Sequence, residues 1–170
     1  MNISLLLKNI AGFFILILLQ VLIFNNIGIT SWKIVPAIFL LIILLLPFET
    51  PDWLILIIAF LSGFVIDIFS DTIGLNSASC VLFAFFRPLV LRSLSPRGGY
   101  DPGTYPKVQY MGLPWFLKYS SILIFSHQLM YYILEDFSFA HFFRIIIKIV
   151  IGTFFSLLLI AVSQFLVFRK

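Results

Sequence analysis

Asp67 and Asp71 are the acidic side chains of this sequence best placed to do chemistry, because an apolar run leads directly into them. If that run crosses a membrane, an ionised carboxylate inside it costs about 2.5–3.5 kcal/mol, so Asp67 needs a partner or a function. Three interpretations of Asp67 stay open: a packed helix end whose carboxylate reaches the outer interface, a polar contact that defines the fold or binds a partner, and an ion or proton relay. The two acids share a helical face only if the helix continues past Ser70, and no basic or metal-binding cluster flanks them, so they make a poor active site.

A second group of polar side chains interrupts the apolar stretch after residue 112. His127 lies there beside Gln128, and it shares a helical face with Ser120. A metal ion would need two or three further ligands, but His141 stands at unrelated spacing and the single cysteine, Cys80, lies inside an apolar run. We therefore expect His127 to make a hydrogen bond between helices and expect no metal site.

Small residues recur at spacings of four in two of the apolar runs. Ala59, Gly63 and Asp67 fall on one helical face, and Gly152 and Ser156 fall on another. This spacing lets two helices approach closely, so both faces are candidates for helix packing or partner binding.

Two arginines, Arg87 and Arg92, stand near the end of another apolar run. Long basic side chains at such a position extend to anionic lipid headgroups, which we favour over a specific protein contact.

Known catalytic motifs are missing from the sequence, including a nucleophile elbow, a phosphate-binding loop, a zinc-binding H-E-x-x-H and a dinucleotide fingerprint. We expect no catalytic activity and no cofactor.

The elements that carry these residues are strongly apolar. Hydrophobic residues make up 62% of the 170 positions and charged residues 11%, and the mean hydropathy is +1.15. A soluble domain has about 25% charged residues, so the solvent of this chain is the lipid bilayer. The net charge of +4 comes from basic residues beside apolar runs, which argues for membrane topology and against nucleic-acid binding.

A membrane-spanning helix needs about 20 residues, so the apolar runs predict an all-α bundle of about six transmembrane helices. The expected spans cover about residues 5–24, 32–46, 53–69, 77–91, 113–134 and 142–168 of a single integral membrane domain, residues 1–170. The segment from about 92 to 112 is rich in Pro and Gly and is expected to be a loop. The second span is the shortest, and without it the termini would lie on opposite sides.

Charge placement predicts the orientation of the six spans. With the N-terminus inside, eight of the eleven basic residues lie on the inner side and three on the outer side. Basic residues in short loops favour the cytoplasm, so both termini and the 92–112 loop are expected to be cytoplasmic.

Three stretches of this chain, in order, resemble the MreD family of bacterial rod-shape-determining proteins. The most telling stretch has the pattern Gly63-x-x-x-Asp67, followed by Gly74-Leu75 and Asn76. The other two are Leu19–Val21 with Asn25 and Pro36, and Arg87-Pro88 with Ser95–Tyr100 and Met111-Gly112.

This resemblance implies a subunit of the cell-elongation complex in the bacterial inner membrane. Its partners would be the periplasmic scaffold MreC, the actin-like MreB, the glycosyltransferase RodA and a class B penicillin-binding protein. The implied fold is similar to the substrate-binding subunits of energy-coupling-factor vitamin transporters, so a small-solute (vitamin) binding subunit of a transporter is the alternative. That alternative needs a pocket with convergent polar groups open to the outer side, where the expected loops are short and poor in polar groups.

Overall fold

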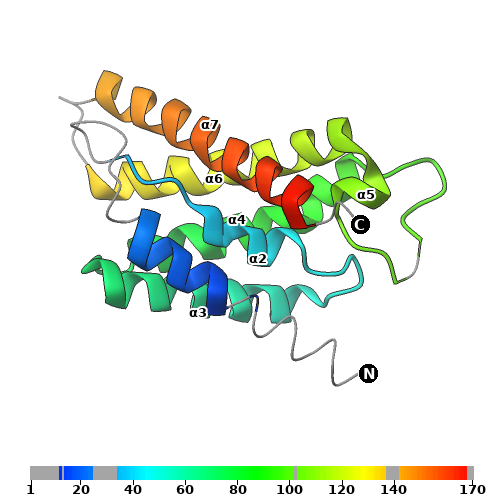
Figure 1. Ribbon diagram of the computed structural model, residues 1–170, viewed down its shortest axis with the longest axis horizontal. Helices are drawn as coiled ribbons and strands as arrows, with labels where there is room; N and C mark the ends of the chain where they lie inside the picture. Colours follow the sequence, from blue (N-terminus) through cyan, green and yellow to red (C-terminus); the bar gives the residue numbers. More distant parts are fainter. Residues whose placement is uncertain (1–11, 13, 25–33, 102, 137–141, 168–170) are drawn as a thin grey trace.

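The computed structural model describes residues 12, 14–24, 34–101, 103–136 and 142–167, and every regular element in these ranges is helical (Figure 1). A helical stretch at Phe14–Ile23 passes into the π-helical η1 (Gln20–Phe24). The elements after it are η2 (Ile38–Leu40), α2 (Leu41–Leu44), α3 (Asp52–Ser70), α4 (Leu75–Ser93), α5 (Val108–Met111), α6 (Leu113–Glu135) and α7 (Phe142–Val167).

Three helices, α3, α4 and α7, have the length and the apolar composition needed to cross a membrane. Large apolar side chains cover the outside of the bundle, among them Phe60, Leu89 and Phe154. Such a surface suits lipid better than water. The expected helical membrane class is therefore confirmed at this level for the part of the chain that the structure describes.

Helix α6 packs between α4 and α7 (Figure 1). It is 23 residues long and less apolar than α7, and it carries the polar residues Ser120, His127 and Gln128. All three side chains are buried against the neighbouring helices. These three polar residues of α6 therefore face protein.

The expected second span is not one helix. Residues 34–37 are extended, and the helical part that follows, η2 with α2, covers only residues 38–44. Pro36 explains the interruption, because proline has no N–H to donate and disfavours helical geometry at the residue before it. A continuous helix over 32–46 is therefore a wrong prediction for residues 34–37.

This interrupted segment is nevertheless deeply buried among the described residues. The side chains of Ile34, Phe39, Leu40, Ile43 and Leu44 are at most 1% exposed. Helix α3 contacts α2, α7 contacts η2, and Gln20 of η1 binds the backbone of η2.

Helices α3 and α4 form an antiparallel hairpin with a tight turn between them. Asp71, with φ of 53°, ends α3, and Gly74, with φ of 76°, begins α4. The glycine allows a left-handed backbone at no steric cost. A turn over residues 70–74 agrees with the sequence-based expectation.

Gly63 sets the distance between these two helices. A Cβ atom at this position would lie 2.6 Å from both the backbone oxygen of Asn76 and the Cα of Ser77. Ala59, one turn earlier, is fully buried. The small-residue face of α3 is therefore occupied by α4 of the same chain.

Gly63→Ala is expected to open this hairpin, and Gly152→Ala is its matched control. Both changes gain about 1 kcal/mol of helix propensity. At Gly152 the added Cβ meets only the side chains of Gln128 and Tyr132, at 3.2–3.3 Å, whereas at Gly63 it meets backbone. Overpacking costs about 1–3 kcal/mol, so Gly63→Ala should unfold more easily than Gly152→Ala in detergent micelles titrated with dodecyl sulfate. Equal stabilities of the two variants would contradict the close α3–α4 contact.

Candidate functional site

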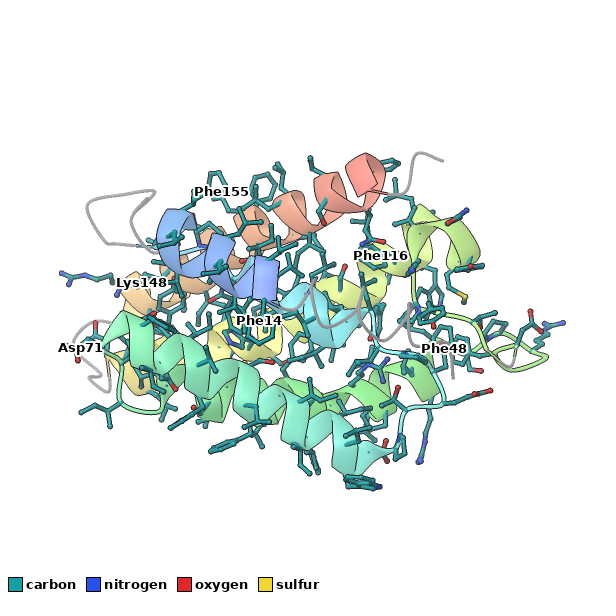
Figure 2. All side chains as sticks on the ribbon, turned by 60° about the horizontal axis from the view of Figure 1, so that its bottom comes forward. Phe14, Phe48, Asp71, Phe116, Lys148 and Phe155 are labelled. Carbon is teal, nitrogen blue, oxygen red and sulfur yellow. The ribbon has the colours of Figure 1, made fainter. Side chains whose placement is uncertain are left out.

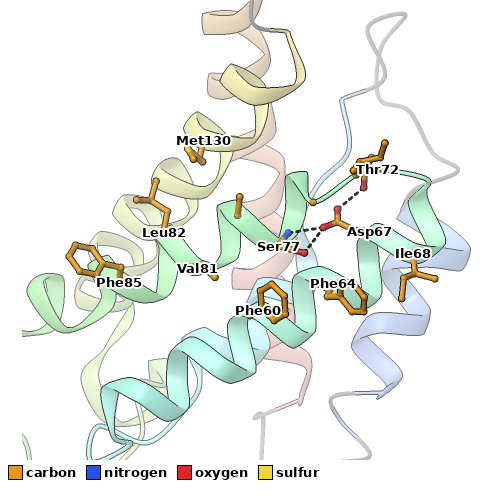
Figure 3. A pocket seen from close by; sticks show the side chains of 13 residues that line it. Phe60, Phe64, Asp67, Ile68, Thr72, Ser77, Val81, Leu82, Phe85 and Met130 are labelled. Carbon is orange, nitrogen blue, oxygen red and sulfur yellow. Dashed lines mark hydrogen bonds between the residues drawn. The ribbon is translucent and has the colours of Figure 1, made fainter.

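Asp67 is 5% exposed, and its carboxylate accepts five hydrogen bonds. Figure 3 draws those from Thr72 and Ser77. Oδ1 accepts from the Thr72 hydroxyl at 2.7 Å, from the Asn76 backbone N–H at 2.9 Å and from the Asn76 side-chain amide at 3.0 Å. Oδ2 accepts from the Ser77 backbone N–H at 2.9 Å and from its hydroxyl at 2.6 Å.

These contacts make Asp67 the cap of a neighbouring helix. The first N–H groups of a helix lack acceptors within the helix, and the cap residue of α4, Gly74, has no side chain to supply one. Asp67 supplies the acceptor from α3, and its negative charge lies at the positive end of the α4 dipole. The geometry matches the interpretation of Asp67 as a contact that defines the fold at the end of α3.

Asp71 does not join Asp67. Its left-handed backbone ends α3 after Ser70, so the two acids do not share a helical face. The Asp71 side chain is exposed at the turn.

Gln20 and Ser156 bind the extended backbone around Pro36. The Gln20 side-chain amide donates to the Pro36 carbonyl at 2.9 Å and accepts from the Ile38 N–H at 2.9 Å. The Ser156 hydroxyl accepts from the Ala37 N–H at 2.9 Å. Backbone groups left without helical partners by Pro36 are thus satisfied by side chains of η1 and α7.

Arg87 and Tyr119 bind the other end of the same segment. The Tyr119 hydroxyl donates to the Leu44 carbonyl at 3.1 Å and accepts from Arg87 Nε at 3.0 Å. Arg87 Nη2 donates to the carbonyls of Leu46 and Pro47. Arg87 is 1% exposed, so it does not extend to lipid headgroups as expected, whereas Arg92 is exposed.

Helices α6 and α7 meet through Gln128 and Ser156. Gln128 Nε2 donates to Ser156 Oγ at 3.2 Å, and Ser156 donates to the Gly152 carbonyl at 2.6 Å. His127 is also buried, with its ring edge-on to Phe39 at 5.8 Å, but neither ring nitrogen has a hydrogen-bond partner in the described part of the chain. The hydrogen bond between helices that we expected of His127 is made by its neighbour Gln128.

Two contacts were not foreseen from the sequence. Lys148 pairs with Glu135 at 2.7 Å and joins the ends of α6 and α7, and Arg87 pairs with Tyr119. Opposite charges on the two sides of a short loop were the available signal for the first pair. For the second pair the sequence carried no signal.

Two hollows are present in the surface formed by the described residues. An apolar groove of about 880 Å³ runs between α3, α4 and α6, with Asp67 and Thr72 at one end. Figure 3 shows its lining, which includes Phe60, Phe64, Val81, Leu82, Phe85 and Met130. A smaller pocket of about 480 Å³, lined in part by Arg87 and Arg92, lies at the other end of α4.

No three His, Cys, Asp or Glu side chains of the described ranges gather closely enough to hold a metal ion. Comparisons with protein-family models, curated protein sequences and solved structures find no match to this chain.

Asp67→Asn is expected to destabilise the protein, and Asp71→Asn, with the same change of charge, is its control. The asparagine keeps one acceptor oxygen but turns an amide group toward the two Ser77 donors. Hydrogen bonds to charged groups contribute about 1.5–3 kcal/mol, so the loss should be of that size, and larger for Asp67→Leu. Unfolding in detergent should show Asp71→Asn within about 0.5 kcal/mol of wild type. If Asp67→Asn were equally harmless, Asp67 would not be the cap of α4.

Proposed function

We propose that this protein is a non-catalytic subunit of the bacterial cell-elongation complex, of the MreD type, which binds partners such as MreC through helix contacts in the inner membrane. The observation that carries the proposal is the separation of polar side chains in the interior from apolar side chains on the surface. The polar side chains Asp67, Gln20, Arg87 and Ser156 are engaged within the chain. The outside offers apolar side chains and an apolar groove.

The groove suits an apolar membrane helix of a partner. Phe60 and Phe64 line it from α3, Val81 and Phe85 line it from α4, and Met130 lines it from α6. Without a hydrophobic driving force in lipid, helices associate by close packing, and a groove between three helices offers more contact than a single convex helix does.

Six spans remain the proposed topology, with η2 and α2 as the core of an interrupted second span. Irregular backbone is tolerated at membrane depth where protein buries it, as it does here. Phe48, after the second span, and Asp71, after the third, lie at opposite ends of the bundle (Figure 2). This alternation supports crossings in opposite directions, and the charge placement is what favours both termini in the cytoplasm.

The alternative, a solute-binding subunit of a transporter, has less support. It requires convergent polar groups in a pocket open to the outer side. The groove at the Asp71 end is almost wholly apolar, and the polar pocket lies at the end that carries residues 95–101, which is the inner side in the proposed orientation. The arrangement therefore favours partner binding.

Val81→Trp is expected to reduce capture of MreC, because the indole fills the groove. Val150→Trp, on the exposed surface of α7 (57% exposed), is the matched control. Quantitative co-purification from membranes with equal amounts of each variant should show a several-fold loss for Val81→Trp alone, about 1 kcal/mol or more. Equal capture of MreC by both variants would remove the groove from the proposal.

The orientation is tested by single cysteines at exposed positions of opposite ends, Ser95→Cys and Asp71→Cys. Native Cys80 is fully buried and should stay unlabelled. A membrane-impermeant maleimide should label Asp71→Cys in intact cells, and it should label Ser95→Cys only after permeabilisation. The reverse pattern would invert the topology. Labelling of both cysteines in intact cells would exclude an odd number of crossings between them, and so the proposed single crossing by α4.

A further inference from the structure

Arg87 carries a buried positive charge and forms no ion pair with a carboxylate of the described residues. Its hydrogen-bond acceptors are the neutral Tyr119 hydroxyl and the carbonyls of Leu46 and Pro47. A guanidinium has five N–H donors, and these contacts use only Nε and Nη2, so Nη1 has no acceptor among the described residues. A buried cation without a counter-charge is costly, so an anion beside it would stabilise the fold.

The pocket of about 480 Å³ provides the place for that anion. Arg87 and Arg92 both line it, and Thr50 and Ser95 add hydroxyl groups. Arg92 lies one helical turn and one residue after Arg87 on α4, is exposed, and makes no side-chain hydrogen bond or ion pair within the described ranges. The pocket therefore combines one fixed guanidinium with one that is free to close on a ligand.

Charge in this pocket favours a monoanion. Asp52 also lines it, so two positive side chains face one negative side chain and the net charge is a single positive one. Tyr100 adds no charge, because burial raises the pKa of its hydroxyl, which donates to the Leu91 carbonyl at 2.7 Å. A phosphodiester carries one negative charge and forked oxygens that guanidinium groups bind in pairs.

The pocket lies where such groups are found in a membrane. Trp53 follows Asp52 at the start of α3 and is 63% exposed, and Trp115, at the start of α6, donates from its indole to the Leu94 carbonyl at 3.0 Å. Tryptophan gathers at the level of the lipid headgroups. The two tryptophans therefore predict that the pocket opens at the height of the headgroups.

We propose that Arg87 and Arg92 form a binding site for a phosphate group, supplied by the phosphodiester headgroup of a lipid in the adjoining leaflet. The headgroup enters between α4 and the loop after it, with Arg87 as the fixed donor and Arg92 as the closing one. This site is separate from the apolar groove and stands whether or not a partner binds there.

The test is titration of the purified full chain in maltoside micelles with dihexanoyl-phosphatidylglycerol, and separately with sodium phosphate at constant ionic strength. Arg92→Gln removes one ligand-binding group without removing any internal contact. Arg97→Gln is its control, because it makes the same change of charge in the same segment but does not line the pocket. Arg87→Lys keeps the buried positive charge but removes the paired N–H groups of the guanidinium. Thermal unfolding of each variant checks that it is folded.

Phosphatidylglycerol should bind saturably. Arg92→Gln should weaken its affinity about tenfold, because one charge-assisted hydrogen bond is lost. Arg97→Gln should leave the affinity near that of the wild type. If sodium phosphate binds with the same dependence on Arg92 and phosphatidylglycerol does not, the phosphate site stands and its ligand is free phosphate. Equal weakening by Arg92→Gln and Arg97→Gln, or no saturable binding of either probe, would overturn the site.

Discussion

The structure depends on satisfying the backbone of one buried, irregular segment. Residues 34–37 are extended and 38–44 form only about two turns of mixed helix, yet most of their side chains are buried. Inside a membrane no water is available to bind N–H and C=O groups that a helix would have paired, and each unpaired group costs several kcal/mol. Side chains from other elements must supply the partners. Gln20 and Ser156 do so at the start of the segment, and Tyr119 and Arg87 do so at its end.

Several polar side chains of the interior therefore satisfy backbone groups. Asp67 does so as well, because it accepts hydrogen bonds from α4 N–H groups that have no acceptor within their own helix. Polar contacts between membrane helices contribute only about 0.6 kcal/mol each on average, so the fold rests on several of them together with close packing at Gly63 and Ala59. With its polar groups engaged inside, the protein meets its surroundings through apolar side chains, which is the surface expected of a subunit that works by contact.

The long helices could be predicted from the sequence, and the contacts between them could not. The bounds of α3, α4, α6 and α7 lie within two residues of the expected spans, because turn residues and polar residues interrupt the apolar runs clearly. Periodicity also placed Ala59, Gly63 and Asp67 on one face. It could not say that α4 covers that face, nor that Ser156 binds a backbone group 119 residues earlier. Pro36 indicated an interruption of the second span, but the apolar residues around it led to the prediction of a continuous helix. His127 drew attention by its type, although its neighbour Gln128 makes the contact.

Hydrogen exchange of the backbone amides of residues 34–46, followed by mass spectrometry in detergent micelles, tests the central claim most directly. If side chains satisfy this segment, its amides should exchange slowly despite its irregular backbone, far more slowly than those of the exposed residues 95–101. Gln20→Leu removes both contacts to Pro36 and Ile38 and should speed exchange in 34–46 while leaving the core of α4 unchanged. Exchange of 34–46 in the wild-type protein as fast as that of 95–101 would contradict the account.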